Sequence, residues 1–180
     1  MKQWLIIILL IVVTCVAVFI SARRKERFHA IPADAWHCLE HPQEMTLYSL
    51  DPDLSYANAR LAAGTSTDAK VETNTFHEYR VLGQTKIDTT TDRVVVANEI
   101  RNAVDSWRGH QHLCFNPRHG VRVTDGRSSF DFLPCFECEY LLVFSGEQQV
   151  GATVIHRSPD TLNNLLRTAN VPLAPPPLGH

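Results

Sequence analysis

An uncharged apolar run near the start of the chain constrains its fold more than any other feature. Nineteen consecutive residues, from Trp4 to Ala22, carry no charge and are rich in Leu, Ile and Val. A helix of this length, rising about 1.5 Å per residue, reaches about the thickness of the bilayer hydrocarbon. Trp4 suits one membrane interface, and the basic residues at 23, 24, 25 and 27 suit the other. The run predicts a transmembrane anchor over residues 4–22, with the membrane as a partner.

A cleaved signal peptide is the alternative to this anchor. The apolar region of a signal peptide is about 7 to 15 residues long and ends in small residues. Here Phe19 and Ile20 continue almost to the basic residues, which favours an uncleaved single-pass anchor. More basic residues follow the run than precede it, and this predicts a cytoplasmic position for the rest of the chain, with a periplasmic or other extracytoplasmic position as the alternative.

The charge of the remaining chain argues against a nucleic-acid partner. The whole chain has 17 Lys and Arg against 19 Asp and Glu, for a formal net charge of -2. Residues 1–27 hold five basic groups and one acidic group, so residues 28–180 carry a formal charge of -6. Binding to a phosphate backbone needs a concentration of Lys and Arg, so we expect no nucleic acid.

Hydrophobic periodicity predicts strands in the second half of the chain. Apolar residues recur at every second position over residues 113–123 and again over 130–144, which is typical of half-buried strands. The Asp125-Gly126 pair predicts a turn between them, and a third strand near 151–156 completes a meander.

The first half of the chain is predicted to form shorter strands. Two amphipathic helices are predicted, one before the meander and one after it. A strand is expected over 45–50, stopped by Asp51-Pro52-Asp53, and an extended segment over 76–87. Helical spacing of apolar residues predicts helices over 92–107 and from Ser158 to Asn170.

These elements together predict one α+β domain over residues 44–173, in which an antiparallel sheet packs against the helix at 92–107. Residues 23–43 are expected to be a tether with a short helix between Pro32 and His41, and residues 174–180 a Pro-rich tail.

Three cysteines of the domain form the main candidate for chemistry. The alternation places Cys114 and Cys135 on the polar face of the sheet and Cys138 in the core. In a regular strand Cys135 and Cys138 point to opposite faces, and only a bulge near Pro134 would bring them together. Four readings stay open: structural cysteines, a Cys114–Cys135 disulfide, a zinc site that includes His119, and a reactive thiol.

The turn at 117–120 is a candidate ligand site. Arg118 offers a guanidinium that binds carboxylate or phosphate, and His119 offers an imidazole that titrates near neutrality. The alternative is an ordinary bend with exposed polar side chains.

A set of short segments in this chain is similar to a known family. YSLDP at 48–52, FHEYRVLG at 76–83, CFNPRHG at 114–120, CFEC at 135–138 and VPLAP at 171–175 together resemble a family of uncharacterised bacterial proteins over most of residues 44–175. The resemblance implies a bacterial source, and therefore a bacterial membrane, and it implies that the two cysteine segments matter as a unit. It assigns no activity, cofactor or ligand, so no residue role is carried over.

The functional prediction is a membrane-anchored, non-enzymatic binding or interaction module with a protein or small ligand as its partner. The sequence has no phosphate-binding glycine loop, no Gly-x-Ser-x-Gly elbow and no His-Glu-x-x-His pair. One alternative is a thiol- or metal-dependent enzyme that uses Cys114, Cys135 and His119, with zinc as the cofactor. The other is a structural envelope protein.

Overall fold

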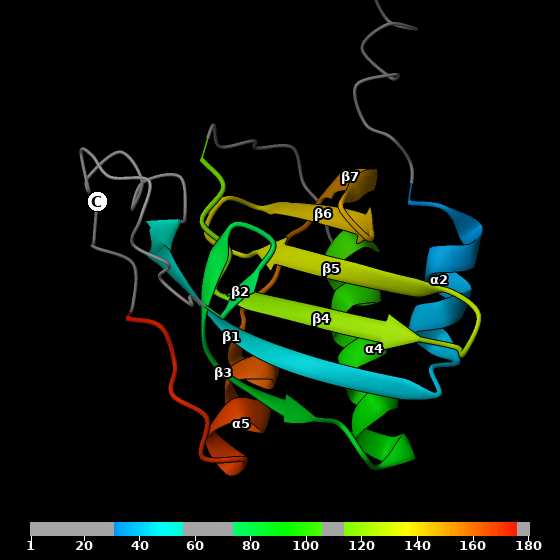
Figure 1. The fold of residues 1–180 in the computed structure, drawn as a ribbon, viewed down its shortest axis with the longest axis horizontal. Coiled ribbons are helices and arrows are strands. Elements are labelled where there is room, and N and C mark those ends of the chain that lie inside the picture. The colour runs from blue at the N-terminus through cyan, green and yellow to red at the C-terminus, as the bar shows by residue number, and fades with distance from the viewer. Residues whose placement is uncertain (1–30, 56–73, 106–113, 176–180) are drawn as a thin grey trace, which may run out of the picture.

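The computed structural model describes residues 31–55, 74–105 and 114–175 (Figure 1). The expected anchor over 4–22 lies outside these ranges. Within them, no helix is both long enough and apolar enough to cross a membrane.

Seven strands form one antiparallel sheet, in the order β2-β3-β1-β4-β5-β6-β7 (Figure 1). The second half of this order, from β4 to β7, is a meander of four strands, where the alternation predicted three. The strands are β1 (Glu44–Ser55), β2 (Thr75–Phe76), β3 (Tyr79–Lys86), β4 (His119–Thr124), β5 (Ser129–Cys135), β6 (Tyr140–Ser145) and β7 (Gln148–Val154). The predicted α+β architecture with an antiparallel sheet is confirmed.

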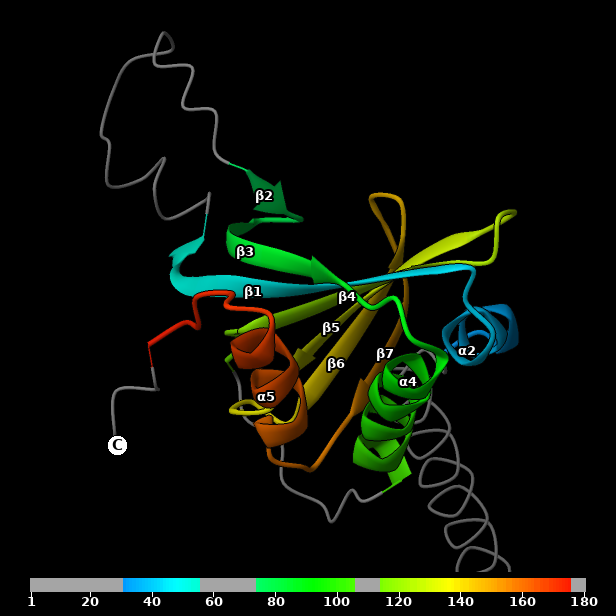
Figure 2. The same cartoon turned by 90° about the horizontal axis from the view of Figure 1, so that it is seen from below.

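The helices of the described ranges lie on one side of the sheet (Figure 2). They are α2 (Ala33–Glu40), α4 (Thr90–Asp105) and α5 (Asp160–Thr168). The start of α4 is fixed by a reciprocal cap: the Asp92 N–H donates to Thr89 Oγ1 at 3.0 Å, and the Thr89 hydroxyl donates to the Asp92 carboxylate at 2.7 Å. The helix therefore begins two residues earlier than predicted.

The main core lies between the sheet and the helices, and a second apolar cluster covers part of the opposite face. Tyr48 stacks on Phe76 in this second cluster, with ring centroids 4.3 Å apart, and Leu50 and Leu133 are buried beside them. Both faces of the central strands are therefore covered. The main core contains, among others, Leu39, Met45, Leu47, Val96, Ile100, Val121, Val123, Phe130, Phe132, Leu141, Val143, Leu162 and Leu166.

Two strand predictions in the cysteine region are wrong. The strand expected from residue 113 begins only at His119, and residues 114–118 are irregular. The strand expected over 130–144 is broken by a turn at 136–139, where Glu139 has a φ of 54°. Phe132 pairs with Val143, so even positions of β5 share a sheet face with odd positions of β6. Because both faces of the sheet are buried, the even positions of β6 are apolar as well, and the alternation continued through the turn without a break.

The first strand and the predicted tether also differ from expectation. β1 continues past Asp51 and Pro52 to Ser55, because irregularities in its pairing with β3 accommodate the proline. The short helix expected in the tether is α2, and it packs into the core through Ala35, Cys38 and Leu39, which are fully buried. The folded body thus extends to the N-terminal side of residue 44.

Candidate functional site

Two adjoining cavities lie where four segments meet: the chain before β4, the turn at 136–139, the start of α5 and the C-terminal segment 171–175. They measure about 300 and 400 Å³ and share the residues Arg118, His119 and Pro159. The first is also lined by Asn116, Phe136, Glu137 and Arg157, and the second by Asn163, Arg167, Leu173, Ala174 and Pro175. We call them together the Arg118 cavity.

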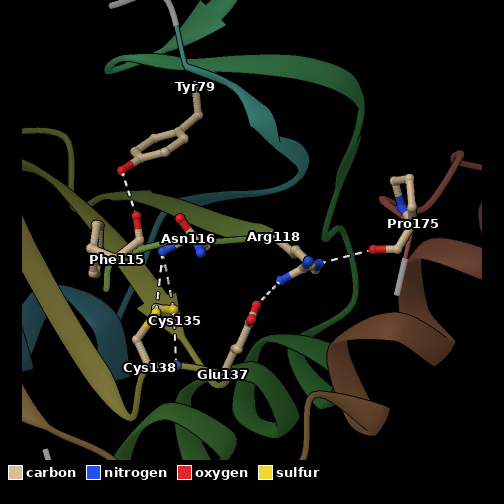
Figure 3. Close-up of polar contacts among 8 residues, drawn as sticks. All are labelled: Tyr79, Phe115, Asn116, Arg118, Cys135, Glu137, Cys138 and Pro175. Carbon is tan, nitrogen blue, oxygen red and sulfur yellow. Dashed lines mark hydrogen bonds and ion pairs between the residues drawn. The ribbon is translucent and has the colours of Figure 1, made fainter. Parts of the chain in front are cut away.

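Arg118 connects three of these segments (Figure 3). Its guanidinium donates through Nη1 to the Glu137 carboxylate at 2.5 Å and through Nε to the Pro175 carbonyl at 3.0 Å. Its own carbonyl accepts the Leu50 N–H at 3.0 Å, which ties the segment to β1. The side chain is only 17% exposed, so the cationic group is held in one place at the cavity wall.

His119 is buried beside it and is neutral. Its Nε2 hydrogen bonds to Asn163 Oδ1 in α5 at 2.9 Å, and its ring meets the Phe136 ring edge-on. Burial lowers the pKa of His119 to about 4, helped by the charge of Arg118 and opposed by the Asn163 bond. With Nε2 donating to Asn163, Nδ1 is an unprotonated acceptor, and it has no partner within the described ranges.

The cavity carries an excess of positive charge. Arg157 and Arg167 line it in addition to Arg118, and neither forms an ion pair with any described carboxylate. Arg167 donates instead to the neutral Asn164 side chain at 2.9 Å. Glu137 is the acidic residue in the described lining. Because its lining holds three guanidiniums and one carboxylate, the cavity favours the binding of an anion.

Three cysteines lie on the two segments that line the first cavity: Cys114, Cys135 and Cys138. Figure 3 shows the last two of them. The Asn116 N–H points at two sulfurs, 3.4 Å from Cys135 Sγ and 3.3 Å from Cys138 Sγ, and the Cys138 N–H lies 3.2 Å from Cys135 Sγ. Asn116 and Glu137 belong to both the thiol segments and the cavity lining.

These contacts correct the predicted placement of the sulfurs. Cys135 is buried and not on a polar face, whereas the burial of Cys138 and the exposure of Cys114 agree with the prediction. The turn at 136–139 brings Cys135 and Cys138 together, and no bulge at Pro134 is needed. The four described cysteines are free thiols.

All three thiols resist ionisation. Burial raises the pKa of Cys114 and of Cys138 to about 11, and it also raises the pKa of Cys135. The neighbouring Cys138 and the charge of Glu137 raise the pKa of Cys114 further. Few of these thiols are therefore thiolates at neutral pH.

The predicted zinc ligands do not form one group. Within the described part of the chain, no set of three His, Cys, Asp or Glu side chains is arranged to hold a metal ion. His119 is turned toward α5, where it bonds to Asn163. Zinc binding stays a prediction.

Arg118 and His119 are brought together as the sequence suggested, but most of the cavity was missed. Arg157, Asn163 and Arg167 belong to no motif, and the signals near them were the helix start at Ser158-Pro159-Asp160 and the VPLAP segment at 171–175, which includes Pro175. Comparison with protein-family models, curated proteins and solved structures finds no match. The resemblance to a bacterial family therefore stays a prediction.

Proposed function

We propose that this protein is a membrane-anchored, non-enzymatic module that binds a small anionic molecule carrying a carboxylate or phosphate group in the Arg118 cavity. The observation that carries the proposal is the presence of Arg157 and Arg167 in the cavity lining without carboxylate partners among the described residues. A guanidinium pairs with two oxygens of a carboxylate or phosphate at once, so a bound anion would supply the carboxylate-like partner that neither arginine has among the described residues.

The remaining lining supports a ligand that is more than an anionic group. The neutral His119 lines both cavities, so its ring supplies contact to a ligand without adding charge. Phe136, Leu173 and Pro175 supply apolar contact. The volumes of about 300 and 400 Å³ are in the range of sites for small molecules.

A non-enzymatic role is supported by the partners of the imidazole. A nucleophilic mechanism needs a base within hydrogen-bond reach of the nucleophile. His119 bonds to Asn163 and stacks edge-on against Phe136, and none of the three thiols lines the cavity. The membrane part of the proposal is supported by the apolar run over 4–22 and by the basic residues after it, which favour a cytoplasmic domain.

The test is calorimetric titration of the full-length chain in detergent micelles with inorganic phosphate and, separately, with succinate. We expect saturable binding of at least one of these probes with one site per chain. Arg157→Gln and Arg167→Gln are each expected to weaken it roughly tenfold, because each removes one charge-assisted contact.

The matched control is Arg127→Gln. Arg127 is an exposed arginine in the turn after β4, at the opposite end of that strand from Arg118, and it should leave the affinity unchanged. Absence of saturable binding of both probes would overturn the proposal. An equal loss in the Arg127 variant would show a general charge effect and would also overturn it.

A further inference from the structure

We propose that the molecule bound in the Arg118 cavity carries two anionic groups, one at each end, and bridges the two adjoining cavities. This inference rests on the proposed function and names the class of ligand, which is a dianion with an uncharged middle. The observation that carries it is the separate placement of two arginines. In the described lining, Arg157 belongs to the first cavity alone and Arg167 to the second alone.

Each of the two cavities carries its own excess of positive charge. The described lining of the first holds Arg118, Arg157 and one carboxylate, Glu137. The described lining of the second holds Arg118 and Arg167 and no carboxylate. A single anionic group in one cavity would leave the arginine of the other without a carboxylate or phosphate partner. Two anionic groups match the two arginines.

Arg118 lies at the boundary between the cavities and needs no partner from the ligand. Its guanidinium already donates to the Glu137 carboxylate and to the Pro175 carbonyl. The other residues that line both cavities are the neutral His119 and Pro159. The boundary thus offers the ligand two uncharged rings, which favours a ligand whose middle is uncharged.

Helix α5 sets the spacing of the two charges. Arg157 lies just before this helix, and Arg167 lies in its last turn. The helix has nine residues, so its ends are about 13 Å apart. A ligand that pairs with one guanidinium at each end therefore needs its charges separated by on the order of 10 Å. A short dianion such as succinate would contact one arginine, whereas an extended dicarboxylate would contact both.

The affinity of a bridging ligand depends on its length. Once one anionic end is bound, binding of the other end becomes an intramolecular event. The gain in affinity disappears when the linker is too short to span the two arginines, and it declines again when the linker exceeds the span. A maximum in affinity at one ligand length is therefore expected.

The test is calorimetric titration of the full-length chain in detergent micelles with four dicarboxylates of increasing length: succinate, adipate, suberate and sebacate. The matched probe at each length is the half-amide of the same acid, which has the same chain and one charge fewer. We expect the diacid to bind roughly tenfold more tightly than its half-amide at one length of the series, and by a smaller factor at succinate. Equal affinities of diacid and half-amide at every length would overturn the inference.

Two variants assign the ends of the ligand. In Arg157→Gln and in Arg167→Gln, the diacid and its half-amide should bind equally to within about twofold, because one arginine remains to pair with one carboxylate. Arg127→Gln should keep the full advantage of the diacid, since Arg127 is exposed and outside the described lining. An advantage that persists in either cavity variant would contradict a bridging ligand.

Inorganic phosphate, titrated into the same preparation, separates this inference from the proposed function. Saturable binding of phosphate together with equal binding of diacids and half-amides would refute the bridging ligand and leave the anion site standing. Absence of saturable binding by phosphate and by every acid of the series would refute both.

Discussion

His119 in β4 hydrogen bonds through Nε2 to the side-chain oxygen of Asn163 in α5, at 2.9 Å. This bond joins the sheet to the helix at the wall of the Arg118 cavity and fixes which imidazole nitrogen faces α5. It also holds a histidine that burial keeps neutral, because protonation would place a charge in a desolvated site beside Arg118.

The first prediction is a loss of stability in mild acid. The pKa of His119 is about 4 in the folded protein against about 6.5 when unfolded, so the unfolded chain binds more protons between these values. Stability should therefore fall as the pH drops from 6.5 toward 4, by about 2 kcal/mol between pH 6.5 and 5. Urea denaturation of the wild type and of His119→Gln measures it. A variant that keeps the full pH dependence would contradict this account.

The second prediction concerns the carboxylate in the cavity. Glu137→Gln removes negative charge from the lining and releases Arg118 from its ion pair, so the affinity for inorganic phosphate should rise roughly tenfold. Glu139→Gln is the matched control, because Glu139 pairs with His156 and does not line the cavity. Weaker binding by the Glu137 variant in calorimetry would be inconsistent with an anion site.

The third prediction concerns a buried ion pair on the other face of the sheet. Asp131 is 3% exposed and accepts two bonds from Arg122 at 2.7 Å and one from His77 at 2.9 Å. Burial raises the pKa of Asp131, but these bonds outweigh it and hold the pKa below its usual range. Asp131→Asn should destabilise the fold by about 2 kcal/mol in urea denaturation. Asp88 is exposed, and Asp88→Asn should change the free energy of unfolding by less than about 0.5 kcal/mol. Equal effects of the two substitutions would argue against a stabilising role of the bonds to Asp131.

The fourth prediction concerns the reactivity of Cys114. Partial desolvation, the neighbouring Cys138 and the charge of Glu137 raise its pKa to about 11, so its thiolate fraction should rise about tenfold per pH unit from pH 7 to 10. Alkylation by iodoacetamide, followed at the Cys114 peptide, should show this slope without a plateau near pH 9. A plateau there would mean that the thiol titrates as it does in an unfolded peptide.

The fold was largely predictable from the alternation of apolar residues in the strands and from their helical spacing in the helices. Both patterns arise because one face of each element is buried. The meander and the helix over 92–107 followed from these patterns. The turn at 136–139 did not, since Phe136 and Cys138 continue the apolar alternation of β5 through the turn. The extension of β1 past Pro52 was also hidden, because its pairing irregularities with β3 leave no signal in composition.

The site was predictable only where its residues are adjacent in sequence. Arg118 and His119 occupy one turn and were identified together. Arg157 and Arg167 reach the same cavity because α5 packs beside β1 and bonds to His119 of β4, which is a tertiary arrangement that no local pattern specifies. The contact between Cys135 and Cys138 was missed for the same reason as the turn that creates it.

The most direct test of an anion in the Arg118 cavity is a phosphate titration of the full-length chain with ¹⁵N-labelled histidines, followed by NMR. His119→Gln assigns the His119 signals, and the half-buried His77, which bonds to Asp131, is the internal reference. We expect the His119 side-chain signals to shift saturably, with the same dissociation constant as the calorimetric titration, while the His77 signals stay in place. A stationary His119, or equal shifts in both histidines, would contradict the proposed site.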